Sequence, residues 1–165
     1  MEKETLLRQG YGRARKIYVA SDHAGFELKE KLLVYLGELG YVVEDMGAYV
    51  YNEKDDYPEF ISKAAEEVSK DPENSLGIVL GGSGEGEAMV ADRYPGVRAA
   101  VYYGGNLEIV KLSREHNDSN ILSLGARFLK EEEAKEAVKL WIETPFSQDE
   151  RHVRRIKEIE ELKIK

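Results

Sequence analysis

The sequence predicts one α/β domain, a five-stranded parallel sheet between two layers of helices, of the Rossmann or flavodoxin-like type. Two observations predict this fold. Short apolar runs typical of strands alternate with longer segments whose apolar residues recur at helical spacing. The chain has 165 residues, a length that suits one domain with one core. Because such strands are joined by right-handed crossovers, we expect ligands at the carboxyl ends of the strands.

The expected elements alternate along the chain from residue 17 onward. The strand-like runs cover residues 17–20, 41–43, 76–80, 97–102 and 120–124. The helical segments cover residues 28–39, 57–69, 88–91, 107–114, 131–143 and 149–165. Gly40 and Pro145 each end a helical segment, since glycine adopts the left-handed conformation and proline cannot continue the helix. We expect an N-terminal extension over residues 1–15 and the folded domain over 16–165.

The last helical segment carries a single apolar stripe. Its members are Val153, Ile156, Ile159 and Leu162. A stripe of this kind on a terminal helix packs against an apolar surface. Either the chain's own domain or a partner subunit would supply that surface.

The composition excludes several classes of function. The net charge of −8 disfavours broad binding to nucleic acid. The absence of cysteine excludes disulfides, thiolate metal sites and cysteine nucleophiles. The start of the chain is charged and no apolar run has membrane length, so neither a signal peptide nor a membrane span is predicted. We therefore expect a cytoplasmic protein that binds neither nucleic acid nor a membrane.

A glycine-rich loop, Gly81-Gly82-Ser83-Gly84-Glu85-Gly86-Glu87, follows the third strand and opens a helix. Its glycines exceed what a tight turn needs, and they let the backbone approach a ligand closely. Free N–H groups at the start of a helix stabilise a negative oxygen. The loop is not a dinucleotide fingerprint, because it follows the third strand, nor a P-loop, because no Gly-Lys-Ser/Thr follows. We interpret it as an anion or oxyanion site; a tight turn is the alternative.

Glu87 lies in the first turn of the helix after this loop. A carboxylate there is favoured by the helix dipole, which is a purely structural explanation. Beside an oxyanion site that includes the Ser83 hydroxyl, it would also serve as a general base for a carbon next to a carbonyl. Glu85 competes for this role, but its position between two loop glycines predicts that it points to solvent.

Further candidate residues lie near the first and fifth strands. Ser21-Asp22-His23-Ala24-Gly25 follows the first strand, where Ser or Asp would equally cap the next helix. His116-Asn117-Asp118 lies between a helix and the fifth strand, and a lone histidine is more often structural than catalytic. All three histidines of the chain, including His152, fall in candidate site segments. No HxxxH or HxH spacing occurs, so we expect no metal site.

A positive patch lies on the last helical segment. Arg151 and Arg155 are four residues apart and share a helix face, with His152 and Arg154 beside them. Guanidinium groups bind phosphate in a bidentate geometry. Pairing with neighbouring glutamates on a solvated helix face is the structural alternative.

Together these segments resemble the type B ribose-5-phosphate isomerases, which are related to galactose-6-phosphate and allose-6-phosphate isomerases. The resemblance covers about residues 17–160. The motifs that carry it are Ser21-Asp22-His23-Ala24-Gly25, Asp56-Tyr57-Pro58, Gly82-Ser83-Gly84-Glu85-Gly86-Glu87, Ser113-Arg114-Glu115-His116-Asn117-Asp118, Gly125-Ala126-Arg127 and Arg151-His152-Val153-Arg154-Arg155. Their order and spacing are specific only when taken together.

The resemblance implies an isomerase that interconverts ribose 5-phosphate and ribulose 5-phosphate through a cis-enediolate, with no metal and no cofactor. The implied catalytic residues are Glu87, His116, Ser83 and Asp22. His116 would open the sugar ring, Glu87 would move the proton between C2 and C1, and the loop amides with Ser83 would stabilise the enediolate. The implied substrate-binding residues are His23, Tyr57, Gly82, Gly84, Gly86, Asn117, Arg127, Arg151, His152 and Arg155, the last four for the phosphate.

The family that the chain resembles has two branches, which differ in the residue that serves as the catalytic base. One branch has a cysteine directly before the glycine loop, at the position of Gly81 in this chain. The other has a glutamate directly after the loop, at the position of Glu87, so the chain is similar to the glutamate branch. In this family the site lies between two subunits. The resemblance therefore also implies a homodimer, or a tetramer, with the C-terminal helix packed on a partner subunit.

Two segments depart from the family's usual sequence, Val90-Ala91-Asp92-Arg93 and Tyr102-Tyr103-Gly104-Gly105-Asn106. They leave open a first alternative, an isomerase of a six-carbon sugar phosphate (allose 6-phosphate or galactose 6-phosphate) or of another aldose. The second alternative is a non-catalytic, flavodoxin-like module that holds a phosphate. The combination of Glu87 with His116 argues against this module, because holding an anion requires neither residue.

Overall fold

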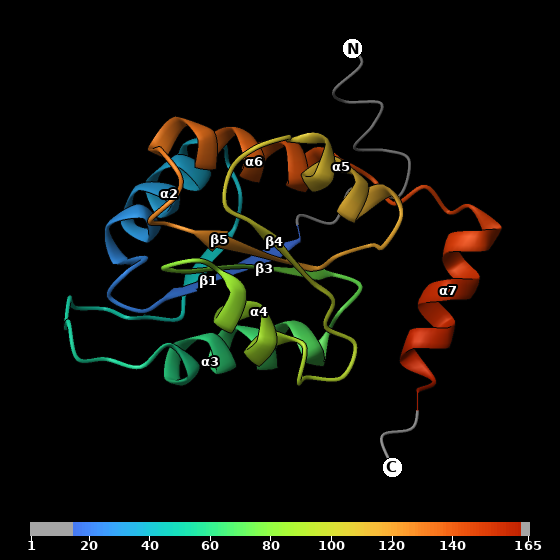
Figure 1. Cartoon of the computed structure of the whole chain (residues 1–165), viewed down its shortest axis with the longest axis horizontal. Coiled ribbons are helices and arrows are strands. Elements are labelled where there is room, and N and C mark those ends of the chain that lie inside the picture. The colour runs from blue at the N-terminus through green and yellow to red at the C-terminus, as the bar shows by residue number, and fades with distance from the viewer. Residues whose placement is uncertain (1–14, 163–165) are drawn as a thin grey trace.

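A computed structural model describes residues 15–162 and has the predicted sheet between two helical layers (Figure 1). The strands are β1 (Lys16–Ser21), β2 (Val43–Asp45), β3 (Ser75–Gly81), β4 (Ala99–Tyr102) and β5 (Ile121–Gly125). The helices are α2 (Phe26–Glu38), α3 (Tyr57–Lys70), α4 (Glu85–Ala91), α5 (Glu108–Glu115), α6 (Glu131–Glu143) and α7 (Glu150–Glu160). The extension predicted over residues 1–15 lies, except for Arg15, outside the described residues.

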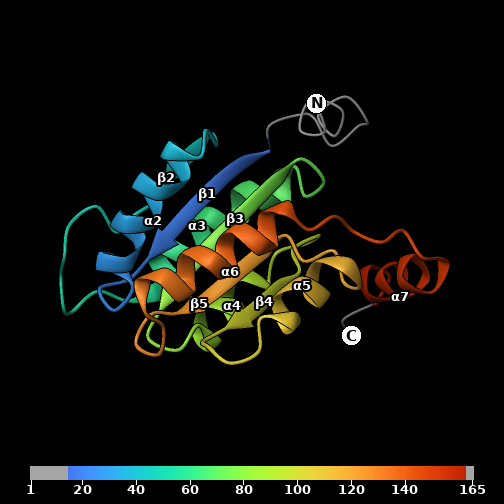
Figure 2. The same cartoon turned by 90° about the horizontal axis from the view of Figure 1, so that it is seen from above.

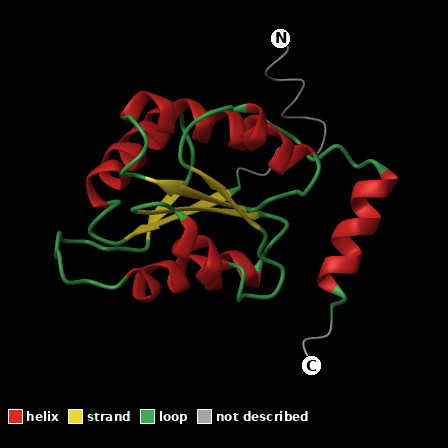
Figure 3. Ribbon diagram, viewed as in Figure 1, coloured by secondary structure: helices red, strands yellow, loops and turns green. Residues whose placement is uncertain are grey.

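The helices divide between the two faces of the sheet. Helices α2, α5 and α6 cover one face, and α3 and α4 cover the other (Figures 1 and 3). Helix α7 belongs to neither layer and lies to one side of the molecule in both views (Figures 1 and 2). Val153 and Ile159 of α7 are exposed, and so is Leu162 just after it, so the fold of one chain leaves the predicted stripe largely uncovered. Within residues 15–162, no helix has both the length and the apolar character that crossing a membrane requires.

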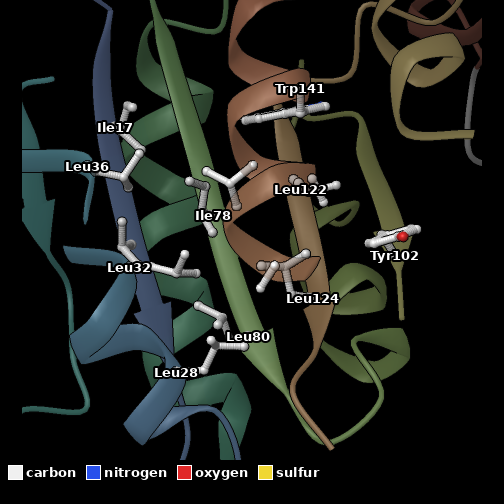
Figure 4. Close-up of a cluster of buried hydrophobic side chains, with 14 of the residues drawn as sticks. Ile17, Leu28, Leu32, Leu36, Ile78, Leu80, Tyr102, Leu122, Leu124 and Trp141 are labelled. Carbon is white, nitrogen blue, oxygen red and sulfur yellow. The ribbon is translucent and has the colours of Figure 1, made fainter. Parts of the chain in front are cut away.

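The core consists of two apolar clusters, one on each face of the sheet. The larger cluster joins leucines of α2 and residues of α6 to the strands, and Figure 4 shows it. Trp141 of α6 is completely buried in it, and its indole N–H donates a hydrogen bond to Ser119 Oγ at 2.8 Å. The smaller cluster packs alanines and branched residues of α3 and α4 against the opposite face. These helices therefore hold the strand ends in place from both sides.

Two of the predicted strand boundaries are wrong. The second strand is Val43–Asp45 rather than 41–43, because Tyr41 still donates its backbone N–H to Leu36 O of α2, at 3.1 Å. Val42 is then 53% exposed, which an apolar run does not suggest. The fourth strand begins at Ala99 rather than at residue 97. Arg98 does not join the strand, because its backbone N–H donates to a side-chain oxygen, Asn120 Oδ1, at 2.8 Å rather than to a neighbouring strand.

The strand order is β2-β1-β3-β5-β4, and all pairs are parallel. The chain moves outward from β1 to β2 and returns to β3 on the other side of β1, so β1 and β3 flank a topological switch point. Ser21 at the end of β1 pairs with Leu80, and Gly81 at the end of β3 pairs with Gly125. The segments after β1, β3 and β5 therefore emerge side by side.

Candidate active site

The glycine loop after β3 is held against the end of β5. The backbone N–H groups of the two residues after β5 donate to the carbonyl oxygens of Gly81 and Gly82, at 2.8 and 3.1 Å. Ser123 Oγ donates to Gly84 O at 2.6 Å. Gly84 has φ +84°, and a Cβ atom there would lie 3.1 Å from Ser123 O. Glycine is therefore required at this position, both for the backbone conformation and for the close packing of the loop on β5.

The Glu87 carboxyl lies directly beside Gly81. Glu87 is only 3% exposed, whereas Glu85 points to solvent as predicted. A Cβ atom on Gly81 would come within 1.7 Å of Glu87 Oε1, so the carboxyl occupies the space that any other side chain at position 81 would need. Burial raises the pKa of Glu87 and the nearby negative charge of Asp22 adds to this, while the N–H groups of Glu87 and Gly84 oppose it. These are the surroundings of a carboxylate suited to take up a proton.

Asp22 is buried at the end of β1. Its Oδ1 accepts the backbone N–H of Ala24 at 2.9 Å and that of Gly25 at 3.3 Å. Asp22 therefore orders the turn before α2, but the structural alternative, that Ser or Asp caps this helix, is wrong, because Gly25 is the N-cap residue and no side chain caps it. Because its charge also acts on Glu87, Asp22 belongs to the same group of residues as the glycine loop.

His23 contacts a residue that the sequence did not single out. Asp55, in the segment between β2 and α3, accepts the His23 backbone N–H at 2.9 Å through Oδ1. The same oxygen lies 2.7 Å from His23 Nδ1. Nothing in the spacing distinguishes Asp55 from Asp56, so the pattern of acidic residues could not identify this contact. The ring of Tyr51 stands edge-on to His23, with the centroids 6.4 Å apart.

Two further predicted residues border the glycine loop. The ring of Tyr57, the first residue of α3, covers Gly86, where a Cβ atom would lie 2.7 Å from Tyr57 Oη. The guanidinium of Arg127 covers Gly82, where a Cβ atom would lie 3.2 Å from Arg127 Nη1. One chain therefore brings together the predicted residues Asp22, His23, Tyr57, Gly82, Ser83, Gly84, Gly86, Glu87 and Arg127, which we call the loop half of the site.

The remaining predicted residues gather at a different place. The rings of His116, which follows α5, and His152, in α7, stack with centroids 4.3 Å apart at 40°. His152 is buried, and its Nδ1 lies 3.0 Å from Ser147 Oγ. Burial is the main cause that lowers the pKa of His152, and the electrostatic effects of the neighbouring His116 and Arg151 lower it further. The members of this group, which we call the arm half, are His116, Asn117, Arg151, His152 and Arg155.

The two halves lie at opposite ends of the sheet in one chain. His116 precedes β5 and so lies at its amino end, whereas Gly125 ends β5 beside the glycine loop. The four residue steps of β5 alone span about 13 Å. Helix α7 lies on the opposite side of the molecule from the β2–α3 segment, which carries Asp55 (Figures 1 and 2). A single chain therefore does not place His116 near Glu87, nor Arg127 near Arg151 and Arg155.

One group of side chains has the composition of a metal site. Ligand atoms of Asp22, His23 and Asp55 lie within 4.8 Å of one another, the single such group among residues 15–162. The donor set, two carboxylates and an imidazole, would suit a divalent cation. However, His23 Nδ1 already lies at hydrogen-bonding distance from Asp55 Oδ1, so hydrogen bonding accounts for this pair without an ion.

Comparisons with known proteins identify the family of this chain. The family model described as Ribose/Galactose Isomerase matches residues 17–159. The chain belongs to the ribose/galactose isomerase family. It is 43% identical to ribose-5-phosphate isomerase B of Mycolicibacterium paratuberculosis, over 86% of this chain and 87% of that protein. It is 35% identical to ribose-5-phosphate isomerase B of Escherichia coli, over 88% of this chain and 94% of that one.

Solved structures of the family have the same fold. The crystal structure of Mycoplasma genitalium ribose-5-phosphate isomerase B with bound ribulose 5-phosphate matches with a TM-score of 0.84 at 34% identity, covering 88% of this chain and 93% of that one. The Thermotoga maritima ribose 5-phosphate isomerase matches with a TM-score of 0.82 at 41% identity, covering 91% and 100%. As a member of the ribose/galactose isomerases, this chain is an aldose–ketose isomerase.

Proposed function

We propose that this isomerase interconverts ribose 5-phosphate and ribulose 5-phosphate, with Glu87 as the base and without a metal. The observation that carries the proposal is the buried Glu87 carboxyl, set against the glycine loop with a raised pKa. The named relatives act on a five-carbon sugar phosphate, which favours this substrate over a six-carbon one. A cytoplasmic location stays a prediction.

In the proposed reaction Glu87 removes the proton from C2 of the open-chain aldose. The electron pair moves into the C1–C2 bond, and the negative charge settles on the oxygens of a cis-enediolate. Amides of the loop Gly82–Gly86 and the Ser83 hydroxyl donate to those oxygens, which is worth about 100–1,000-fold in rate per donor. Glu87 then returns the proton to C1, while the proton of the C2 hydroxyl passes to the oxygen on C1 and C2 becomes the carbonyl carbon of the ketose. A raised pKa fits both steps, because the same group must accept the proton and give it back.

His116 would supply the acid–base step that opens the ring, and Asp22, His23, Tyr57 and Asn117 would orient the sugar. Arg127 lies in the loop half, whereas Arg151, His152 and Arg155 lie in the arm half. Together they would hold the phosphate, which does not change during the reaction. This division requires two chains, since one chain separates the halves.

We therefore propose a homodimer in which the arm half of each subunit completes the loop half of the other. The exposed apolar residues of α7 support the proposal, because a stripe of this kind is normally covered. Closed two-fold symmetry would form two equivalent sites at once. Two such dimers would make the tetramer that also remains a candidate.

Replacing Glu87 with Gln tests the assignment of the base. Gln keeps the size of the side chain but cannot take up the proton, so we expect kcat to fall by about 100–10,000-fold. Binding of ribulose 5-phosphate, measured by calorimetry, should persist. The control is Glu85→Gln, at the exposed glutamate of the same loop, which should retain activity. Exchange of solvent deuterium into C2 at the normal rate in Glu87→Gln would exclude this role for Glu87.

Mixing two inactive variants tests the shared site. Glu87→Gln damages only the loop half and His116→Ala only the arm half. A mixed dimer then has one site with both changes and one site with neither. After unfolding and refolding the two variants together, about a quarter of the wild-type activity should return, since half of the dimers are mixed. If the mixture stays as inactive as either variant alone, both halves come from one chain and the proposed interface is wrong.

Rates on a panel of five- and six-carbon sugar phosphates, each with EDTA, test the substrate and the metal-free chemistry. We expect ribose 5-phosphate to be turned over fastest, without loss on chelation. A faster rate on allose 6-phosphate or galactose 6-phosphate would reassign the substrate. Loss of activity in EDTA that returns with a divalent cation would point instead to a metal at Asp22, His23 and Asp55.

A further inference from the structure

Asp55 makes two contacts to His23 through a single oxygen. Oδ1 faces the His23 backbone N–H at 2.9 Å and ring Nδ1 at 2.7 Å. An ionised carboxylate can only accept hydrogen bonds, so the ring nitrogen that faces it must carry a proton. In a neutral imidazole the proton is then on Nδ1 and the lone pair is on Nε2. The contact thus selects one of the two tautomers.

The Asp55 carboxyl is largely buried and is held in place by the turn that carries it. The Asp55 side chain is only 6% exposed, and the His23 ring is 24% exposed. Asp55 Oδ2 is buried and has no hydrogen-bond partner among the described residues. The turn that presents Asp55 is closed by its own backbone N–H, which donates to Asn52 O at 3.0 Å. The backbone contact fixes where Oδ1 lies, and the ring contact then fixes how the imidazole is turned.

We propose that Asp55 is a positioning residue that holds His23 in the Nδ1–H tautomer, so that Nε2 accepts a hydrogen bond from a hydroxyl of the sugar. The part of this inference that concerns the sugar rests on the proposed function. The part that concerns the tautomer of His23 rests only on the contact with Asp55. A second-layer carboxylate that fixes a histidine in this way is a common arrangement at sites where the other ring nitrogen meets a ligand. Asp55 acts only through His23 and does not touch the substrate.

The first experiment measures the tautomer. Long-range ¹H–¹⁵N spectra of the uniformly labelled wild-type protein, recorded in EDTA, distinguish protonated from unprotonated ring nitrogens. The chain has three histidines, and His23→Ala assigns the His23 signals. We expect His23 to have a protonated Nδ1 and a lone pair on Nε2. Asp55→Asn keeps an acceptor oxygen at Oδ1 and should keep this tautomer, whereas Asp55→Ala should release the ring to the Nε2–H form. An Nε2–H ring in the wild type overturns the proposal.

The second experiment measures isomerisation of ribose 5-phosphate. Loss of one substrate hydrogen bond corresponds to about a tenfold change in KM. We therefore expect Asp55→Ala to raise KM about tenfold with little change in kcat, and Asp55→Asn to restore most of the loss. Glu53→Ala, which removes an exposed acid from the same segment, is the matched control. In a His23→Ala background, Asp55→Ala should cause no further rise in KM.

The two readouts separate the possible failures. A rise in KM of the same size in the His23→Ala background would mean that Asp55 only supports the segment, and it would overturn the positioning role. If the tautomer behaves as expected but no sugar phosphate is turned over, the proposed function fails while Asp55 still holds His23. The spectrum of the wild type alone decides the tautomer even if Asp55→Ala does not fold.

Discussion

The contact between Gly81 and Glu87 allows one substitution to test the geometry of the base. Gly81→Ala adds a single methyl group, whose carbon would lie 1.7 Å from Glu87 Oε1 and 2.0 Å from Cδ. Real Cβ atoms essentially never approach closer than 3.0 Å, so the carboxyl must move by more than 1 Å. Gly81 does not have a positive φ, so alanine adds no backbone strain. The substitution therefore acts mainly on the position of the carboxyl.

A displacement of about 1 Å at a reacting group costs about 100-fold in rate. We expect steady-state assays of Gly81→Ala to show a kcat about 100-fold lower, with a KM close to that of the wild type, because the phosphate contacts are untouched. Gly37→Ala is the matched control, since a Cβ there meets nothing within 4 Å and the residue lies inside α2. It should keep full activity. Wild-type kcat in Gly81→Ala, together with a crystal structure in which the methyl group has displaced the Glu87 carboxyl, would refute the assignment of Glu87 as the base.

Three other outcomes follow from named contacts. The pKa of Glu87 is higher in the folded protein than in the unfolded chain. Ionisation of Glu87 therefore lowers the free energy of unfolding, and this loss grows as the pH rises from the unfolded pKa through the folded pKa. Glu87→Gln should therefore melt at a higher temperature than the wild type at neutral pH, with the difference shrinking in acid; an equal difference at both pH values would contradict this. Arg151→Ala should raise KM with kcat unchanged, and a loss confined to kcat would argue against phosphate binding by Arg151. Arg114 is buried and donates to Asp118 Oδ1 and to the carbonyl oxygens of Ser119 and Thr144, so Arg114→Ala should lower the free energy of unfolding by about 3 kcal/mol in denaturant titration. A midpoint within error of the wild type would show that water replaces these contacts.

The alternation of strands and helices was enough to predict the layers of this fold but not the order of its strands. Every connection is a crossover between parallel strands, and the sequence carries no signal for how many strand positions each crossover spans. Here β5 inserts between β3 and β4, which places Gly125 beside Gly81. Predicted strand boundaries were wrong where a local hydrogen bond outweighed an apolar pattern. Tyr41 is an example, because its backbone N–H donates to a carbonyl oxygen of α2.

The candidate site was predictable to different degrees. The exposure of Glu85 and the burial of Glu87 were predicted correctly, because two positions that are two residues apart in the first turn of α4 face different sides of the helix. Asp55 was missed because its role depends on a contact with His23 across 32 residues of sequence. The separation of the two halves was implicit in the sequence. His116 follows a helix and precedes a strand, a position that belongs to the amino end of a parallel sheet, whereas the glycine loop follows a strand.

The placement of complementary half-sites at opposite ends of one sheet constrains how copies of this chain can assemble. If each loop half accepted the arm half of a new neighbour, the copies would assemble head to tail into a ring or an open filament. A two-fold axis avoids this, because one pairing uses all four halves and leaves none for a third copy. Completeness of the site would then depend on protein concentration. In the proposed dimer, dilution below its dissociation constant would abolish catalysis, and a sugar phosphate that bound both subunits at once would draw them back together.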